Sequence, residues 1–335
     1  MRKFLAIVFL LGPAFLALAF AVLWGTLALW YKLPLGEALR WIIAACFALL
    51  GLRVLSGFFI TTKRGWYLSF GAVFAGLLLF WVTLKPPTEE AWSPEVARQV
   101  TGTIDGDTLT LSNMRDFQWR TATDFDENWV TRTYDLSKLE SVDLFMSYWG
   151  GPTMAHLMLS FGFSDDQYLT WSIEVRRTVG ESFSPIADFF KANTVSLVAS
   201  AEKDAVGLRS NVQKASVRIF RLNATPSYAR DLLEQYVTAA NSLAKEPIFF
   251  NSLFTNCSMG AIRLAVAANA KFVLDWRVLV NGYFPDYLYE HGSVQTSVTL
   301  EELYERGDIS KRAREVGLTD TYSQAIRVGV PGINP

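Results

Sequence analysis

Cysteine and histidine are scarce in this sequence, and it contains no metal-binding or nucleotide-binding motif. Only two cysteines and two histidines occur among 335 residues, and no zinc pattern, phosphate loop or nucleotide fingerprint is present. The net charge of −1 provides no basic field for nucleic acid. We therefore expect no cofactor, no bound metal and no nucleic-acid partner.

Acidic residues are also nearly absent from the first quarter of the chain. Between Phe4 and Leu84 the only one is Glu37. Three apolar runs lie in this region, and each is about as long as the 20 residues that a membrane span needs. A signal peptide would have a shorter apolar core and no further spans behind it. The sequence predicts a membrane domain, residues 1–85, with three transmembrane helices at about 4–31, 39–60 and 66–84.

The distribution of basic residues predicts an orientation for these helices. Arg2 and Lys3 precede the first run, and Lys63 and Arg64 separate the second run from the third. Basic loops stay in the cytoplasm, so the amino terminus is predicted to be cytoplasmic. Three crossings then place everything after Lys85 outside.

The outer part is predicted as a linker with first strands, residues 86–112, and one domain, residues 113–335. Short runs rich in aromatic and branched residues predict strands: SVDLFMSYW, MAHLMLSFGF, YLTWSIEVRR and SVRIFRL. The IDGD stretch with Asp105 and Asp107 predicts a turn between strands rather than a metal loop. Helical periodicity begins at Pro226 and again near Cys257. The predicted class is α+β, with a mostly antiparallel sheet packed against helices.

The main candidate for chemistry is Cys257, because the other cysteine, Cys46, lies within an apolar run. Thr255 and Asn256 are helix-capping residue types, so the thiol is expected in the first turn of a helix. The amide groups there lower a cysteine pKa and can bind an oxyanion. Asn256 and Ser258, which flank the thiol, are expected to shape this site. A buried, inert thiol is the competing interpretation.

A reactive thiol needs a base, and the sequence offers two histidines for that role. His156 lies in a predicted strand, where it would be held firmly against the cysteine helix. His291 lies in the turn-like YLYEHGSV and is the reserve base. Glu174, on the neighbouring strand, is the candidate to orient the imidazole. A surface salt bridge with Arg176 or Arg177 is the alternative for Glu174.

Several segments in order, between Asn113 and Gly292, resemble the Lnb-type periplasmic domain, named for a bacterial lipoprotein N-acyltransferase. The segments include NMRDFQWRTATDFDENWVTRTYDLSKLESVDLF, AHLMLSFGF, SIEVRRTVGESFSP, AEKDAVGLRSNVQKASVRIFRL, FFNSLFTNCS and DWRVLVNGYFPDYLYEHG. The asparagine–cysteine motif of that family maps onto Asn256 and Cys257, and its histidine maps onto His156. A charged motif maps onto Glu202, Asp204 and Arg209, which are expected to form a structural loop of ion pairs.

The resemblance implies a papain-like thiol fold in permuted order, in which the histidine precedes the cysteine. It also implies a periplasmic domain on the bacterial inner membrane. The family's enzyme carries additional membrane helices after its periplasmic domain, whereas here the predicted helices precede it. The fold therefore transfers more directly than the substrate does.

The leading functional hypothesis is a cysteine-dependent acyltransferase. The acyl chain would pass from a membrane phospholipid to Cys257 as a thioester, and then to an amine such as a lipoprotein amino terminus. One alternative is a thiol hydrolase of the cell envelope, either an amidase or a lipase. The other is a membrane-anchored binding protein without catalysis. The sequence does not indicate an oligomeric state.

Overall fold

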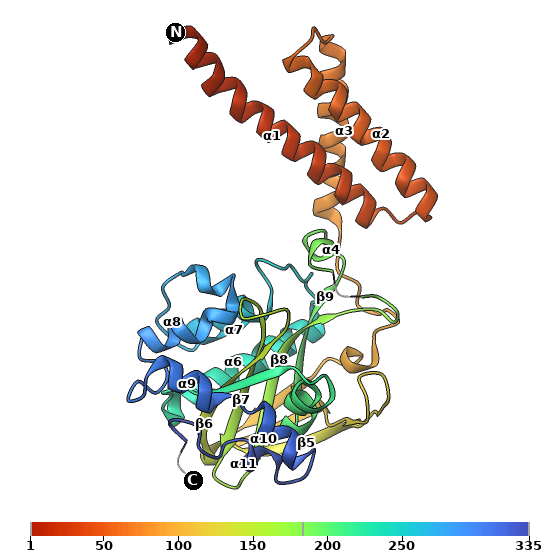
Figure 1. Ribbon diagram of the computed structural model, residues 1–335. Coiled ribbons are helices and arrows are strands. Elements are labelled where there is room, and N and C mark those ends of the chain that lie inside the picture. Colours follow the sequence, from red (N-terminus) through yellow and green to blue (C-terminus); the bar gives the residue numbers. More distant parts are fainter. Residues whose placement is uncertain (1, 183, 334–335) are drawn as a thin grey trace. The chain divides into compact units, whose positions relative to one another are not determined.

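The computed structural model describes residues 2–182 and 184–333, with side chains from Leu11 onward. The chain divides into two compact units (Figure 1). The first comprises residues 1–86 together with Ser184–Ala192, and the second comprises residues 87–183 and 193–335. Each unit is described in turn.

Three long apolar helices form the body of the first unit. They are α1 (Arg2–Lys32), α2 (Glu37–Leu55) and α3 (Arg64–Thr83), joined by the short α4 (Pro185–Phe189) from later in the chain. The stretches long and apolar enough to cross a membrane are Leu11–Lys32, Glu37–Phe58 and Arg64–Thr83. The three predicted membrane helices are confirmed as helices of that length and composition.

Close packing joins α1 to α2. A Cβ atom at Gly51 would lie only 2.4 Å from the Val22 side chain, and one at Gly25 would lie 2.5 Å from Phe47. Small residues let helix backbones approach closely, which is how helices associate in lipid. Large apolar side chains such as Leu16 and Leu79 remain exposed on the outer surface, as expected for helices that face lipid.

An eight-stranded sheet forms the centre of the second unit. The strands follow the order β1-β2-β9-β8-β7-β6-β10, and β5 pairs with β2. All pairs are antiparallel except β2 with β9, so the mostly antiparallel prediction holds but the sheet is mixed. Their bounds are β1 Thr101–Asp105, β2 Thr108–Arg115, β5 Trp129–Asp135, β6 Leu139–Tyr148, β7 Ala155–Phe163, β8 Tyr168–Arg176, β9 Thr194–Ser200 and β10 Ser216–Arg221. A separate ribbon pairs β3 (Gln118–Trp119) with β4 (Phe125–Asp126).

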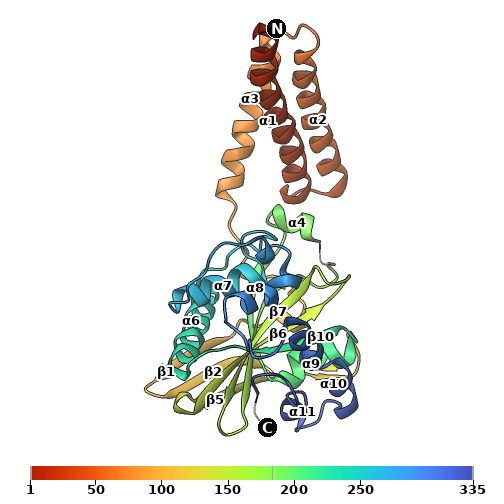
Figure 2. The ribbon, with the colours of Figure 1, turned by 60° about the vertical axis from the view of Figure 1, so that its left-hand side comes forward.

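Helices cover both faces of the sheet, which confirms the α+β class (Figure 2). Each face of the sheet has its own hydrophobic core, and alternate residues of β7 point into one or the other. Leu157 and Leu159 pack with α6, whereas Met158 packs with residues of α5 and α10. The helices are α5 Glu202–Gly207, α6 Pro226–Lys245, α7 Cys257–Ala267, α8 Phe284–Glu290, α9 Leu300–Gly307, α10 Ser310–Val316 and α11 Tyr322–Ala325. Both predicted helix starts, near Pro226 and near Cys257, are confirmed.

The turn predicted at IDGD is also in place. Asp105 ends β1 and Asp107 precedes β2, with Gly106 between them at φ +59°. Only glycine adopts this left-handed conformation without strain. Asp107 forms an ion pair with Arg230, which joins the turn to α6. The second hairpin, β7–β8, turns through residues 164–167.

Candidate active site

Cys257 is the first residue of α7, and the preceding residue caps the helix. The Asn256 Oδ1 atom accepts a hydrogen bond of 2.8 Å from the Met259 amide. This bond satisfies one of the amides that a helix start leaves without an intrahelical acceptor. The amides of Cys257 and Ser258 lie in the first turn, at the positive end of the helix dipole. The local pattern Thr-Asn-Cys thus places the thiol where an anion is stabilised.

The thiol lies where two strands part. β7 and β8 are paired from Gly162 and Tyr168 up to Met158 and Ser172, and the pairing ends there. At this opening α7 packs against both strands. Helix α7 approaches so closely that a Cβ atom on Gly260 would lie 2.4 Å from the Ile173 side chain. The start of α7 therefore contacts both strands.

His156 stands on β7 at the same opening. Its Nε2 atom lies 2.7 Å from the Ser172 hydroxyl and 3.0 Å from the Glu174 carboxylate. With Nε2 engaged in this way, Nδ1 is the nitrogen that remains for the Cys257 thiol, with which His156 interacts electrostatically. The structure thus brings together Cys257, His156 and Glu174, the three residues predicted to form the site.

Glu174 is held by two further residues that the sequence did not single out for the site. The Ser172 hydroxyl donates to its carboxylate at 2.7 Å, and the Arg209 guanidinium lies 3.2 Å away. Glu174 is 20 % exposed, so it is not the surface salt bridge considered as its alternative. Arg209 follows α5 in a π-helical turn, Leu208–Val212. Although partial burial alone would raise the pKa of Glu174, the charges of His156 and Arg209 hold it well below its usual value, so this half-buried carboxylate remains ionised.

The expected ion-pair loop of Glu202, Asp204 and Arg209 is wrong as a single unit. Asp204 pairs with Arg115 at 2.9 Å and accepts from the Trp119 indole. Glu202 pairs with Arg327, and Arg209 pairs with Glu174. Successive side chains of a helix point in different directions. The side chains of Glu202, Asp204 and Arg209 therefore reach three separate parts of the second unit. Only the charge of Arg209 bears on the candidate site.

The pKa values of the thiol and imidazole shift in opposite directions. Burial by itself lowers the pKa of His156, but the Glu174 charge and the hydrogen bonds to Cys257 and Glu174 raise it overall from 6.5 to about 9. Burial raises the pKa of Cys257, but the hydrogen bond and charge of His156 hold it below 9.0. Both shifts favour a thiolate beside an imidazolium at neutral pH. Such a pair is the activated form of a cysteine nucleophile.

We expect Glu174→Gln to raise the pKa of the Cys257 thiol. Without the carboxylate charge the imidazolium loses its main stabilising partner, so the pKa of His156 falls and the thiolate loses its cation. The rate of alkylation by iodoacetamide, followed against pH in a Cys46→Ser background, reports the thiolate directly. Arg209→Gln is the control of opposite sign, because the Arg209 charge lowers the pKa of His156. Equal alkylation profiles for all three proteins would contradict this network.

Asn281 is a site residue that the sequence reasoning missed. It lies in the 3₁₀ turn Asn281–Tyr283. Its Nδ2 atom donates to the Ala155 carbonyl at 2.6 Å and to the Ser258 hydroxyl at 2.8 Å, and lies 3.8 Å from the Cys257 sulfur. Its Oδ1 atom accepts from the Ala155 amide at 2.9 Å. Since an amide nitrogen has only two hydrogens, both are used to hold β7 against α7.

Asn281→Ala is expected to lower the unfolding free energy by about 1–3 kcal/mol, because it leaves buried polar groups at Ala155 and Ser258 unpaired. It also frees β7 from α7, so the rate of Cys257 alkylation falls. Thermal unfolding and alkylation of the purified chain measure the two effects. Asn241→Ala is a matched control, because Asn241 also holds backbone groups of one strand residue, Gly102, but far along the sheet edge. A loss of stability without a change in alkylation would show that Asn281 does not position the thiol.

Asn256 and Ser258, both predicted to shape the site, have different structural roles: Asn256 caps α7 and Ser258 bonds to Asn281. Asn256 acts through its cap, as described above. Ser258 is fully buried, and its hydroxyl meets Asn281 rather than the open side of the thiol. Any oxyanion donors at this position are therefore backbone amides of the helix start, at Cys257 and Ser258.

His291 lies apart from this network. His291 lies in a turn, as predicted, directly after α8, although Tyr287 and Glu290 before it are helical. Its Nδ1 atom is 2.8 Å from the Tyr287 carbonyl, and its ring stacks on Tyr287 at 4.0 Å. None of the contacts recorded for His291 in the described chain involves Cys257, and the geometry favours His156 as the base.

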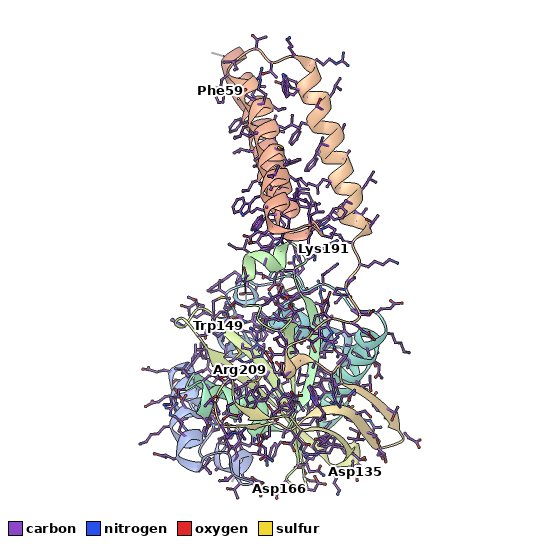
Figure 3. The ribbon with its side chains drawn as sticks, turned by 90° about the vertical axis from the view of Figure 1, so that its right-hand side faces the viewer. Phe59, Asp135, Trp149, Asp166, Lys191 and Arg209 are labelled. Atoms are coloured by element: carbon purple, nitrogen blue, oxygen red, sulfur yellow. The ribbon has the colours of Figure 1, made fainter. Side chains whose placement is uncertain are left out.

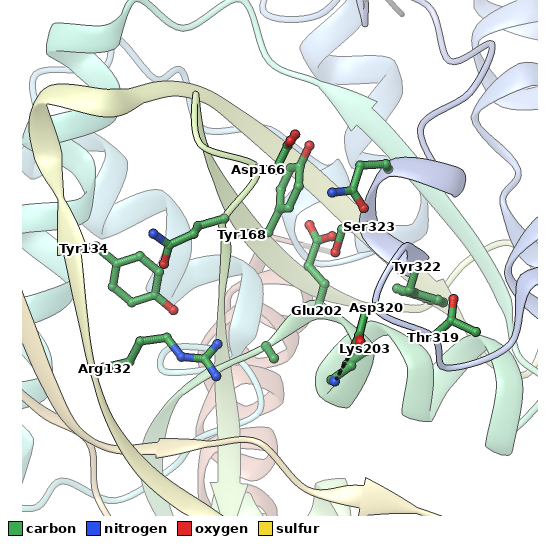
Figure 4. A pocket seen from close by; sticks show the side chains of 13 residues that line it. Arg132, Tyr134, Asp166, Tyr168, Glu202, Lys203, Thr319, Asp320, Tyr322 and Ser323 are labelled. Carbon is green, nitrogen blue, oxygen red and sulfur yellow. Dashed lines mark hydrogen bonds and ion pairs between the residues drawn. The ribbon is translucent and has the colours of Figure 1, made fainter.

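A cavity of about 190 Å³ lies at a different place in the second unit (Figure 4). Asp166 of the β7–β8 turn and Tyr168, the first residue of β8, line it together with Glu202 and the ion pair of Lys203 with Asp320. It contains none of the residues around the thiol, so the reactive group and this cavity are separate. Within residues 2–182 and 184–333, no cluster of three or more His, Cys, Asp or Glu side chains is arranged to hold a metal ion.

Comparison with known proteins agrees with the resemblance seen in the sequence. Residues 125–282 match the model of the family described as the Lnb N-terminal periplasmic domain. No curated protein and no solved structure matches the chain. The matched range includes His156, Glu174, Cys257 and Asn281, that is, the whole network around the thiol. Residues 125–282, all within the second unit of this chain, are therefore similar to the Lnb N-terminal periplasmic domain family.

Proposed function

We propose that this chain is a membrane-anchored, periplasmic, cysteine-dependent acyltransferase with Cys257 as its nucleophile. The observation that carries the proposal is the placement of Cys257 at the amino-terminal end of α7, next to His156, whose Nε2 atom lies 3.0 Å from the Glu174 carboxylate; the lowered pKa of the thiol agrees with it. The family match and the three apolar helices support a location at the outer face of the bacterial inner membrane. The basic residues near α1 and between α2 and α3 support a cytoplasmic amino terminus.

In the first half-reaction the Cys257 thiolate attacks an ester carbonyl carbon of a membrane phospholipid. The carbonyl oxygen becomes an oxyanion, which the amides of Cys257 and Ser258 stabilise at the helix start. The carbon–oxygen ester bond then breaks, and the imidazolium of His156 gives its proton to the departing alcohol. The acyl group remains on Cys257 as a thioester, and His156 is left neutral.

In the second half-reaction an amine attacks the thioester carbonyl. Neutral His156 takes a proton from the amine nitrogen as the carbon–nitrogen bond forms, and the carbon–sulfur bond breaks. The products are an amide and the restored thiolate–imidazolium pair. Glu174 stays ionised throughout and keeps the imidazole in place through Nε2. A lipoprotein amino terminus is the acceptor that the family resemblance favours.

Intact mass spectrometry of the chain purified from its own membrane tests this proposal. We expect a fatty-acyl mass adduct that maps to Cys257 and is released by hydroxylamine. The adduct should persist in Cys46→Ser and disappear in Cys257→Ser. The Cys46 control is needed because a second thiol in a membrane helix could carry its own acyl group.

The fate of the adduct separates transfer from hydrolysis. A diacylated lipopeptide with a free amino terminus should discharge the thioester and gain the acyl chain. Release of free fatty acid in water, with no gain by the peptide, would identify a lipase instead. If no adduct forms even after incubation with phospholipid, the acyltransferase is excluded. An amidase or a binding role would then be pursued.

A further inference from the structure

Three exposed loops lead directly into the residues around the thiol. Residues 149–154 precede His156, residues 251–256 precede Cys257, and residues 273–280 precede Asn281. The first loop touches the turn that follows the third, because the Gly282 amide donates to the Thr153 carbonyl at 3.0 Å. Asn281 bonds to Ala155 and lies 3.8 Å from the Cys257 sulfur, so all three loops end beside the thiol.

These loops present an apolar rim. We use this name for six exposed side chains: Trp149, Met154, Leu253, Phe254, Leu274 and Trp276. Leu274 is 81 % exposed, Phe254 is 61 % exposed and Trp276 is 60 % exposed. Large apolar side chains gathered in this way mark an interaction surface. Exposed tryptophan and phenylalanine are the residues that anchor proteins in the interfacial layer of a bilayer.

Charge at the rim favours the same environment. The loops 149–154 and 251–256 contain no acidic or basic residue. In the third loop the only acidic residue is Asp275, which pairs with Arg277 at 2.9 Å. Arg277 also pairs with Glu290 at 2.7 Å, so these three residues together carry one negative charge. Lys271 and Arg263, on either side of Asn269 in the sequence, are exposed and add two positive charges, which anionic lipid headgroups attract.

A short stretch of chain joins β9 to the unit that holds the three spans. Ala192 belongs to that unit, and β9 begins only two residues later at Thr194. Thr194 pairs with Arg176, two residues from Glu174 on β8. The start of β9, beside the strand that carries Glu174, is therefore a point of covalent connection to the spans.

We propose that the apolar rim docks on the phospholipid bilayer, so that a lipid ester reaches Cys257 directly from the leaflet. The inference deepens the proposed function and rests on it for the identity of the substrate. The position of the rim in the membrane does not depend on catalysis. The tests below separate these two parts.

The first test measures depth in the membrane without activity. The full chain with Cys46→Ala and Cys257→Ser is given one spin label, at Leu274→Cys or at Ser164→Cys, and is reconstituted in vesicles of phosphatidylethanolamine and phosphatidylglycerol. Ser164 is exposed in the β7–β8 turn, next to Asp166 and at the opposite end of the second unit from Trp149 (Figure 3). We expect the label at 274 to collide with dissolved oxygen more than with a water-soluble nickel chelate, and the label at 164 to show the reverse.

The outcomes are distinct. Equal collision patterns at the two positions would overturn docking. Protection of the label at 274 from both colliders would indicate a protein partner or a second copy, and would overturn docking as well. A lipid-like pattern at 274 in a chain that never forms an acyl adduct would support the docking surface while the proposed function fails.

The second test links the rim to lipid turnover. Leu274→Asp combined with Trp276→Asp should lower acylation of Cys257 by vesicle phospholipid at least about tenfold, the order expected when two apolar side chains lose their burial. Alkylation of Cys257 by iodoacetamide should stay unchanged, because neither residue contacts the thiol network. Unchanged acylation in the double variant would contradict the proposal.

Discussion

His156→Ala is expected to lower the rate of Cys257 acylation by about 10⁴-fold, the scale seen when one member of a nucleophile–base–carboxylate set is removed. Two effects act in the same direction. The imidazole that raises the thiolate fraction is lost, and so is the acid that protonates the leaving alcohol. The appearance of the acyl adduct over time, followed by intact mass spectrometry in phospholipid vesicles, measures the rate. Alkylation of Cys257 at neutral pH should slow as well.

His291→Ala is the matched control, because His291 is the only other histidine in the sequence. Its ring contacts Tyr287 and not the thiol, so acylation should continue at the rate of the unaltered chain. If His291→Ala abolishes acylation and His156→Ala does not, the base has been assigned to the wrong residue. Thermal unfolding of both variants establishes that neither result reflects loss of the fold.

Arg327→Met is expected to destabilise the second unit by about 3–5 kcal/mol, the cost of breaking a buried ion pair from one side. Arg327 lies 2.8 Å from Asp143 and 2.5 Å from Glu202, and all three residues are at most 4 % exposed. Asp143 keeps Arg221 as a partner at 2.5 Å. Glu202 keeps only the Ser160 hydroxyl, so its charge is left buried without a cation.

Thermal unfolding of the full chain in detergent, followed by tryptophan fluorescence, measures this loss as a fall in Tm on the order of 10 °C. Arg314→Met removes an exposed arginine from α10 and should leave Tm nearly unchanged. Adding Glu202→Gln to Arg327→Met should recover part of the loss, since it removes the unpaired charge. If Arg327→Met and Arg314→Met melt together, the buried cluster does not stabilise the unit.

Features set by neighbouring residues were predictable from sequence. The start of α7 follows from the capping chemistry of Asn256, and the β7–β8 hairpin follows from two alternating runs with a four-residue turn. The hairpin then places Glu174 beside His156, because side chains at matching positions of adjacent strands share a face. These local signals bring together the thiol, the base and the carboxylate.

Features set by distant contacts were not predictable in this way. β9, with sequence TVSLVAS, is buried along its whole length, so it lacks the alternation of a half-exposed strand. Asn281 acts on Ala155, 126 positions earlier, and a local pattern carries no record of that contact. Its one signal is its place in the family-like segment DWRVLVNGYFPDYLYEHG. Arg209 was grouped with its neighbours, although its partner is Glu174.

The segment Ser184–Ala192, between β8 and β9, packs with the membrane helices and not with the sheet. Phe190 stacks on Tyr31 at 5.4 Å, and the Lys191 amine donates to the Trp81 carbonyl at 2.7 Å. The polypeptide therefore passes between the units three times, and a single proteolytic cut after α3 would not release the second unit. A chain shortened to begin at Pro87 would carry Phe190 without its aromatic partners. Secreting the thiol domain alone thus requires polar replacements in this segment as well as removal of the spans.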